Sequence, residues 1–91
     1  METIVYKNDG KTTEPFDREK LEKTIFAACL NVREPQNSAK ATSNKVAGLV
    51  EEWLTNKQEV TSVDIKEKVT ELLAKYHPEA SYIYEQFDLT I

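Results

Sequence analysis

The hydrophobic residues of this chain recur every three or four positions along most of its length, which is the spacing of amphipathic helices. This pattern predicts four helices, over about residues 17–32, 39–56, 62–76 and 78–89. Each helix is short and carries one apolar stripe, so the four must pack against one another to bury those stripes.

The first fourteen residues follow the alternating pattern of a β-hairpin instead. Residues 3–7 alternate between two faces and are rich in β-branched and aromatic side chains, as short strands are. Asp9 and Gly10 form a two-residue turn signal, because glycine accepts the positive φ that a tight hairpin needs. A return strand over residues 11–14 then completes the hairpin.

Local signals mark where the helices begin. Asp17 suits the N-cap of the first helix, because its carboxylate can accept a hydrogen bond from a free backbone N–H. Thr61 and Asp64 form a capping-box pattern at the start of the third helix. The polar segments 33–38 and 56–59 are predicted to be loops.

These elements together predict an α+β fold that is mostly helical, with an N-terminal β-hairpin at about residues 3–14 packed on four helices. A hairpin alone is only marginally stable in water, so it requires the helices as a surface to pack on. The 91 residues are predicted to form a single domain, 1–91, since a chain of this length leaves little room for a second.

The balance of charge argues against nucleic acid as a partner. The chain has 12 Lys and Arg residues against 16 Asp and Glu residues, which gives a net charge of −4 at pH 7. Direct nucleic-acid binding is not expected, because it needs an excess of cations against phosphate. One anionic ligand, such as a nucleotide, could still occupy a local basic pocket.

Several kinds of chemistry are not expected from this sequence. Cys29 and His77 are the only residues of their types, so neither a disulfide within the chain nor a zinc site or His-based catalytic cluster is predicted. No Walker-type loop or nucleophile elbow is found, and the chain is predicted not to be an enzyme by itself. The lack of a signal-peptide core and of a membrane-length apolar run favours a cytoplasmic location.

The hairpin-to-helix junction is the first candidate for ligand binding. Ammonium groups here could meet phosphate, carboxylates could accept hydrogen bonds from a base or sugar, and apolar side chains could form a slot for a purine. The residues concerned are Lys7, Lys11, Lys20, Glu14, Asp17, Val5, Phe16 and Leu21. The alternative is a solvated hairpin whose lysines only balance nearby carboxylates, and composition alone favours that alternative.

The start of the third helix is the second candidate. A helix N-terminus exposes backbone N–H groups and carries partial positive charge, so it attracts phosphate. Thr61 and Ser62 add hydroxyl groups there, and Lys66 adds a cation one turn later. The alternative is an ordinary capping box, which competes for the same donors.

The order of these motifs resembles the ATP-cone, the regulatory nucleotide-binding domain at the N-terminus of many ribonucleotide reductases and in the bacterial repressor of reductase genes. That family opens with a strand, a Lys-Arg-Asp-Gly-like hairpin and a Glu-Pro-Phe-Asp-like entry into the first helix. This chain has Lys-Asn-Asp-Gly at 7–10 and Glu-Pro-Phe-Asp-Arg-Glu-Lys-Leu at 14–21. Val-Thr-Ser at 60–62 is similar to the family's start of the third helix.

The resemblance implies a non-catalytic allosteric module that senses ATP or dATP, with or without Mg²⁺, and regulates ribonucleotide reductase activity or expression. The implied partners are an adenine nucleotide and either ribonucleotide reductase or another ATP-cone protomer, with no membrane. The residues implied to bind phosphate are Lys7, Asn8, Lys20, Thr61, Ser62 and Lys66. Those implied to bind the base or ribose are Val5, Glu14, Phe16, Asp17, Leu21 and Ile65. No catalytic or metal-binding residue is implied.

Two alternatives stay open, and a departure from the family pattern motivates the first of them. Asn8 stands where the family usually has arginine, which removes a fixed cation and a two-pronged phosphate donor. The first alternative is a degenerate cone that acts as a protein-interaction module. The second is a small DNA-binding regulator, since four short helices could include a helix-turn-helix, although the carboxylates of the third helix oppose phosphate binding.

Overall fold

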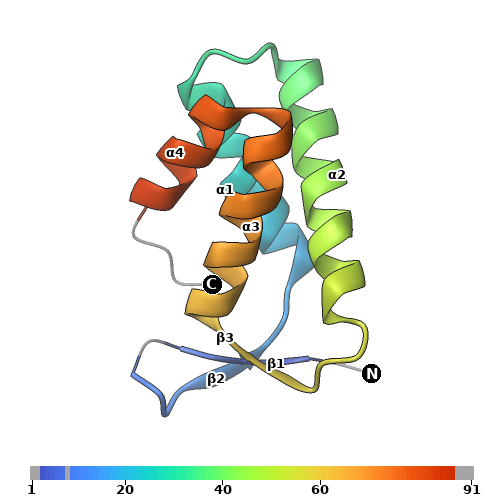
Figure 1. Cartoon of the computed structure of the whole chain (residues 1–91), viewed down its shortest axis with the longest axis vertical. Coiled ribbons are helices and arrows are strands. Elements are labelled where there is room, and N and C mark those ends of the chain that lie inside the picture. The colour runs from blue at the N-terminus through green and yellow to red at the C-terminus, as the bar shows by residue number, and fades with distance from the viewer. Residues whose placement is uncertain (1–2, 8, 88–91) are drawn as a thin grey trace.

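The computed structural model describes residues 3–7 and 9–87 of the chain. The elements within them are, in chain order, β1 (Ile4–Tyr6), β2 (Thr13–Pro15), α1 (Arg18–Asn31), α2 (Gln36–Leu54), β3 (Glu59–Thr61), α3 (Ser62–Tyr76) and α4 (Pro78–Gln86). The strands lie together at one end of the helices (Figure 1). The predicted α+β, mostly helical fold is therefore confirmed.

The hairpin strands belong to a three-stranded sheet with the order β2–β1–β3. β1 is antiparallel to β2 and parallel to β3, with Tyr6 opposite Thr61. The prediction of only a loop before the third helix was wrong here, because β3 was missed. Its three residues are too few to show an alternating pattern, and they form a strand by pairing with a segment that is distant in the sequence.

The connection between β1 and β2 is longer than the predicted two-residue turn. Lys7 N donates to Thr12 O at 2.8 Å, and Gly10 has the predicted positive φ, at 70°. The Asp9 carboxylate accepts hydrogen bonds from the backbone N–H groups of Lys11 and Thr12, both at 2.8 Å. Because these hydrogen bonds hold Lys11 and Thr12 in the turn, the return strand begins at Thr13, two residues later than predicted.

The predicted caps of α1 and α3 are confirmed. Asp17 accepts a hydrogen bond from Lys20 N at 3.3 Å, and Thr61 and Asp64 form the reciprocal bonds of a capping box. The predicted start of α2 at residue 39 was wrong, since the helix begins at Gln36. Its first turn is polar and exposed, so it shows no apolar spacing.

The ends of α2 and α4 also differ from the prediction. α2 ends at Leu54, two residues early, and a short turn leads from it towards β3. α4 ends at Gln86, because the backbone of Phe87 is extended, with φ −67° and ψ 138°. The predicted end at residue 89 lies outside the described residues.

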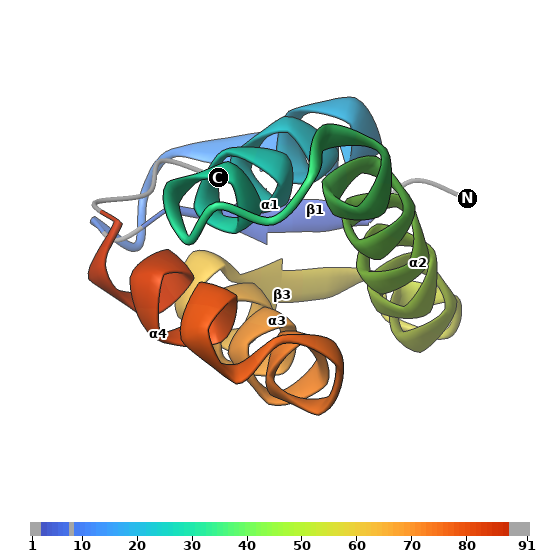
Figure 2. The same cartoon turned by 90° about the horizontal axis from the view of Figure 1, so that it is seen from above.

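The core lies between the helices and the inner face of the sheet. α1 packs on α2 and α3 packs on α4, as Figure 2 shows from above. Val5 of β1 and Val60 of β3 join the helices in this core. Cys29 is fully buried, and burial raises the pKa of its thiol to about 12, which disfavours the reactive thiolate form.

Candidate functional site

The inner face of the sheet places two charged side chains beside the core. Val5 lies opposite Glu14 on β2, and the side chains of directly opposite residues point to the same face. Since Val5 is fully buried against the helices, Glu14 is on this helix-facing side. Lys7 comes two residues after Val5, so the alternation of the strand brings it to the same side.

Glu14 joins two lysines into one cluster, Lys7–Glu14–Lys20. Its Oε1 lies 2.8 Å from Lys7 Nζ and 3.5 Å from Lys20 Nζ. The hydrogen bond from Lys7 and the nearby charge of Lys20 hold the pKa of Glu14 below its ordinary value. The two cations outnumber the anion and all three side chains are partly exposed, so an entering phosphate could replace Glu14 as their partner.

Two open hollows flank the Lys7–Glu14–Lys20 cluster, and both are within the size range of small-molecule sites. The first has a volume of about 560 Å³, lies at the start of α1, and is lined by Glu14, Pro15, Phe16, Asp17, Arg18, Glu19, Lys20 and Glu51. The second has a volume of about 630 Å³, lies at the start of α3, and is lined by Tyr6, Lys7, Gly10, Thr61, Ser62 and Val63. Of the predicted ligand-binding residues, the first hollow thus has Glu14, Phe16, Asp17 and Lys20, and the second has Lys7, Thr61 and Ser62.

The directions of the strands explain this division. β2 ends with Pro15 opposite Ile4, the first residue of β1, whereas β3 ends with Thr61 opposite Tyr6, the last residue of β1. The helices that follow β2 and β3 therefore start near opposite ends of β1. The ion pair between Lys7 and Glu14 links the two hollows.

The start of α3 forms the capping box that the sequence predicted. Asp64 N donates to Thr61 Oγ1 at 3.0 Å, and Thr61 N donates to Asp64 Oδ2 at 3.3 Å. Lys66 Nζ donates to Phe87 O at 3.3 Å and lines neither hollow. Thr61 and Ser62 are therefore brought beside Lys7, whereas Lys66 is not.

Comparison with protein families identifies the family of this chain. The family model described as the ATP cone domain matches residues 3–85. This chain belongs to the ATP-cone family. ATP-cones are regulatory, non-catalytic nucleotide-binding domains that bind ATP or dATP allosterically, so the resemblance drawn from the sequence is confirmed. A search of curated proteins finds no match to the chain.

In this ATP-cone the apolar residues expected around a base mostly lie in the core. Val5, Leu21 and Ile65 are at most 1% exposed. Phe16 is half-buried, packs on the core and lines the first hollow. Of these four residues, Phe16 alone offers surface to a ligand. Asn8, which was also predicted to bind the nucleotide, lies outside the described residues.

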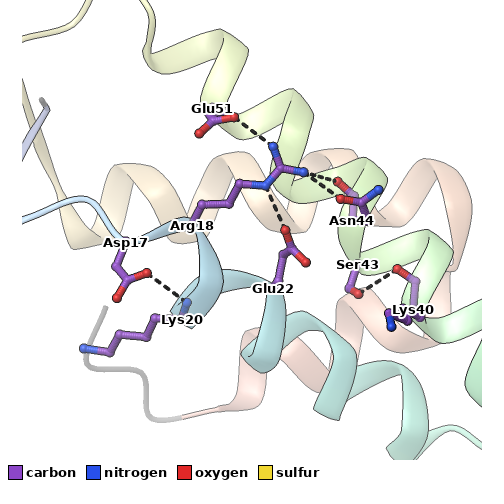
Figure 3. Close-up of polar contacts among 8 residues, drawn as sticks. All are labelled: Asp17, Arg18, Lys20, Glu22, Lys40, Ser43, Asn44 and Glu51. Atoms are coloured by element: carbon purple, nitrogen blue, oxygen red, sulfur yellow. Dashed lines mark hydrogen bonds and ion pairs between the residues drawn. The ribbon is translucent and has the colours of Figure 1, made fainter. Parts of the chain in front are cut away.

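Arg18 is a residue of this region that the sequence did not single out. Its guanidinium donates to Glu22 on α1 and to Glu51 and Asn44 on α2 (Figure 3). Glu22 follows Arg18 by four residues, which is a readable helical spacing for an ion pair. The partners on α2 have no such signal, because they are distant in the sequence.

Neither a metal centre nor a membrane segment is found in residues 3–7 and 9–87. No group of three or more His, Cys, Asp and Glu side chains there is placed to hold a metal ion. None of the helices described is both long enough and apolar enough to cross a membrane.

Proposed function

We propose that this ATP-cone binds ATP and dATP reversibly at the Lys7–Glu14–Lys20 cluster and its two flanking hollows. Through this binding it regulates the activity or expression of ribonucleotide reductase. The observation that carries the proposal is a partly exposed carboxylate shared by two ammonium groups, 2.8 and 3.5 Å away, on the helix-facing side of the hairpin. Membership of a nucleotide-binding regulatory family supports it.

In the proposed complex, the phosphates and the base would contact different residues of the Lys7–Glu14–Lys20 cluster. The phosphates would take Lys7 and Lys20 as charge-assisted partners, with Thr61 and Ser62 at the second hollow. Glu14, freed from the lysines, would accept a hydrogen bond from the amino group of adenine. Guanine presents a carbonyl oxygen in place of that amino group, so a carboxylate at this position favours adenine.

The remaining predicted residues have smaller parts in the proposal. Phe16 would contact the base, and Asp17 would accept a hydrogen bond near the ribose, where ATP and dATP differ by one hydroxyl group. Mg²⁺, when it accompanies the nucleotide, would be held mainly by phosphate oxygens, because the described residues include no metal-binding group of three. Asn8 and Lys66 remain predicted phosphate contacts.

Regulation would follow from a difference in affinity. A ligand shifts a protein between two conformations only as far as it binds one better than the other. ATP and dATP would favour different arrangements of the hairpin against α1, and a partner protein would bind these arrangements with different affinities. The proposed partner is ribonucleotide reductase or another ATP-cone protomer.

Thermal unfolding with ATP, dATP and GTP tests this proposal. A ligand that binds only the folded state at 100 times its dissociation constant stabilises it by about 2.7 kcal/mol. ATP and dATP should raise the melting temperature and GTP should raise it less. Lys7→Ala and Lys20→Ala should abolish the shift, whereas Lys23→Ala, at an exposed lysine one turn further along α1, should retain it. The absence of any shift with either adenine nucleotide would overturn the proposal.

A second candidate is a protein-interaction module that no longer responds to nucleotide. This candidate is favoured because the polar groups of the site already have partners within the domain. Lys7 and Lys20 pair with Glu14, and Thr61 and Asp64 bond to each other in the capping box. In that case the domain folds and associates, and Lys7→Ala leaves association unchanged. A DNA-binding role has less support, because Lys66 is bonded to Phe87 O and Lys68 is paired with Glu71.

A further inference from the structure

Arg18 connects the first turn of α1 to the middle of α2 (Figure 3). Nη1 donates to Glu51 at 2.8 Å, and Nη2 donates to Asn44 Oδ1 at 2.7 Å and to Asn44 O at 3.2 Å. Nε donates to Glu22 at 2.8 Å, which orients the guanidinium from within α1. One side chain thus holds partners on both helices.

The neighbours of Arg18 belong to the proposed nucleotide site. Asp17 precedes it and accepts a hydrogen bond from Lys20 N at 3.3 Å. The side chain of Lys20 in turn lies 3.5 Å from Glu14. A series of direct contacts therefore runs from α2, through Arg18 and the first turn of α1, to the Lys7–Glu14–Lys20 cluster.

Gly48 on α2 leaves space for the guanidinium group of Arg18. Glycine is unfavourable in the middle of a helix, so its presence there needs a reason. A Cβ atom at Gly48 would lie 3.6 Å from Arg18 Nη2 and 3.9 Å from Nη1, which is van der Waals contact. Any longer side chain would displace the guanidinium from Asn44 and Glu51. The surface of α2 is thus fitted to Arg18.

We infer that Arg18 is a positioning residue of the nucleotide site and that it transmits nucleotide binding from α1 to α2. This inference rests on the proposed function. When phosphate replaces Glu14 as the partner of Lys20, the first turn of α1 moves. Arg18 then either moves Asn44 and Glu51 with it or loses its hydrogen bonds to them. Glu51 of α2 lines the first hollow itself, so the response that depends on transmission is that of Asn44, which lines neither hollow.

Calorimetry and NMR on four variants test the inference. Arg18→Ala and Asn44→Ala should weaken ATP binding by about 2- to 30-fold, the range of coupling through such contacts. Arg18→Lys should fall between Arg18→Ala and the wild type, because one ammonium group cannot serve Glu22, Glu51 and Asn44 together. Asn37→Ala removes an exposed asparagine of α2 that makes no described side-chain hydrogen bond, and should bind ATP as the wild type does.

The second measurement separates positioning from a loss of stability. Saturating ATP should shift the backbone amide signals of α2 around Gly48 in the wild type and in Asn37→Ala. Arg18→Ala should lose these α2 shifts even when it is saturated with ATP, while the amides of the hairpin still respond. A general weakening of the fold would not separate the two regions in this way.

The outcomes distinguish the two proposals. If the wild type binds neither ATP nor dATP, the proposed function fails and the inference fails with it. If Arg18→Ala binds ATP with unchanged affinity and an unchanged α2 response, the inference alone is overturned. If Arg18→Ala does not fold, Asn44→Ala decides by the same two measurements, because it removes a side chain from an exposed position only.

Discussion

Glu14 and Glu34 lie at opposite ends of the molecule and have different kinds of partner, ammonium groups for Glu14 and hydroxyl groups for Glu34. Glu14, on β2, is 33% exposed and faces the ammonium groups of two lysines. The side chain of Glu34, in the turn between α1 and α2, is only 7% exposed, and its Oε2 accepts hydrogen bonds from Ser38 Oγ at 2.5 Å and Thr42 Oγ1 at 2.9 Å. The sheet and this turn form the two ends of the fold in Figure 1.

The pKa of each carboxyl is lowered, but by different causes. Lys7 and Lys20 lower the pKa of Glu14. Burial acts to raise the pKa of Glu34, and hydrogen bonds from Ser38, Cys29 and Thr42 outweigh it. The ammonium groups lie on long, partly exposed side chains and can be exchanged for a ligand, whereas the hydroxyl groups of Ser38 and Thr42 lie on short side chains of α2 beside Glu34. The difference separates a carboxylate whose partners can be exchanged from one that is held by the start of the helix that follows it.

The largest predicted effect is on stability. Glu34→Ala should lower the free energy of unfolding by about 2–3 kcal/mol, because it removes two hydrogen bonds to a charged group, from the hydroxyl groups of Ser38 and Thr42. Glu14→Ala should cost less than about 1 kcal/mol, as exposed ion pairs usually do. Urea unfolding followed by the fluorescence of Trp53, the only tryptophan, measures both. Equal losses of unfolding free energy in the two variants would contradict the distinction between the two carboxylates.

Salt should affect the two ends differently. At 1 M salt the screening length falls to about 3 Å, which weakens attraction between exposed charges. The stability cost of Glu14→Ala should therefore shrink as NaCl is added, and that of Glu34→Ala should stay constant. Repeating the urea unfolding over a series of NaCl concentrations tests this, and a strong salt dependence of the Glu34 variant would contradict it.

Acid should remove the contribution of Glu34. Its pKa is lower in the folded state than its ordinary value of 4.5, so its stabilisation is present above about pH 4.5 and is lost as the pH falls through the folded-state value. Glu34→Gln cannot take up this proton and should lose less stability below pH 4.5 than the wild type does. Parallel pH profiles of unfolding for the two proteins would refute this assignment.

The smallest effect concerns a third carboxylate, Asp9, whose donors all come from its own loop. Hydrogen bonds from the Thr12 hydroxyl and from the backbone N–H groups of Thr12 and Lys11 lower the pKa of Asp9 to about 2. Thr12→Val removes the largest of these causes and should raise the pKa towards 3.8 with little change in stability. A pH titration of the side-chain carbon signal by NMR measures the shift, and Thr13→Val is the matched control.

The sequence predicted those parts of the fold that depend on neighbouring residues. The four helices and the caps at Asp17 and Thr61 follow from apolar spacing and from side chains within three or four positions. β3 could not be predicted, since three residues carry too little pattern. Nor could the burial of Glu34, because a polar segment suggests a loop and its enclosure depends on how α1 and α2 pack.

The candidate site shows the same limit. The junction of Lys7, Glu14 and Lys20 was predicted, and the structure brings these three together. The division into two hollows depends on strand directions, which no local motif records. The contacts of Arg18 with Asn44 and Glu51 join residues 26 and 33 positions apart and appear only when the helices are packed.

The parallel pairing of β1 with β3 has a consequence for how the domain assembles. Tyr6 and its hydrogen-bond partner Glu59 are 53 residues apart, with α1 and α2 between them. We expect such a long loop to close after the local helices have formed, because closure entropy grows with the length of the loop. A growing chain that has reached only the end of α2 has a hairpin with one bare edge and none of the hydroxyl groups of Thr61 and Ser62. Nucleotide binding would therefore report that synthesis and folding of the domain are complete.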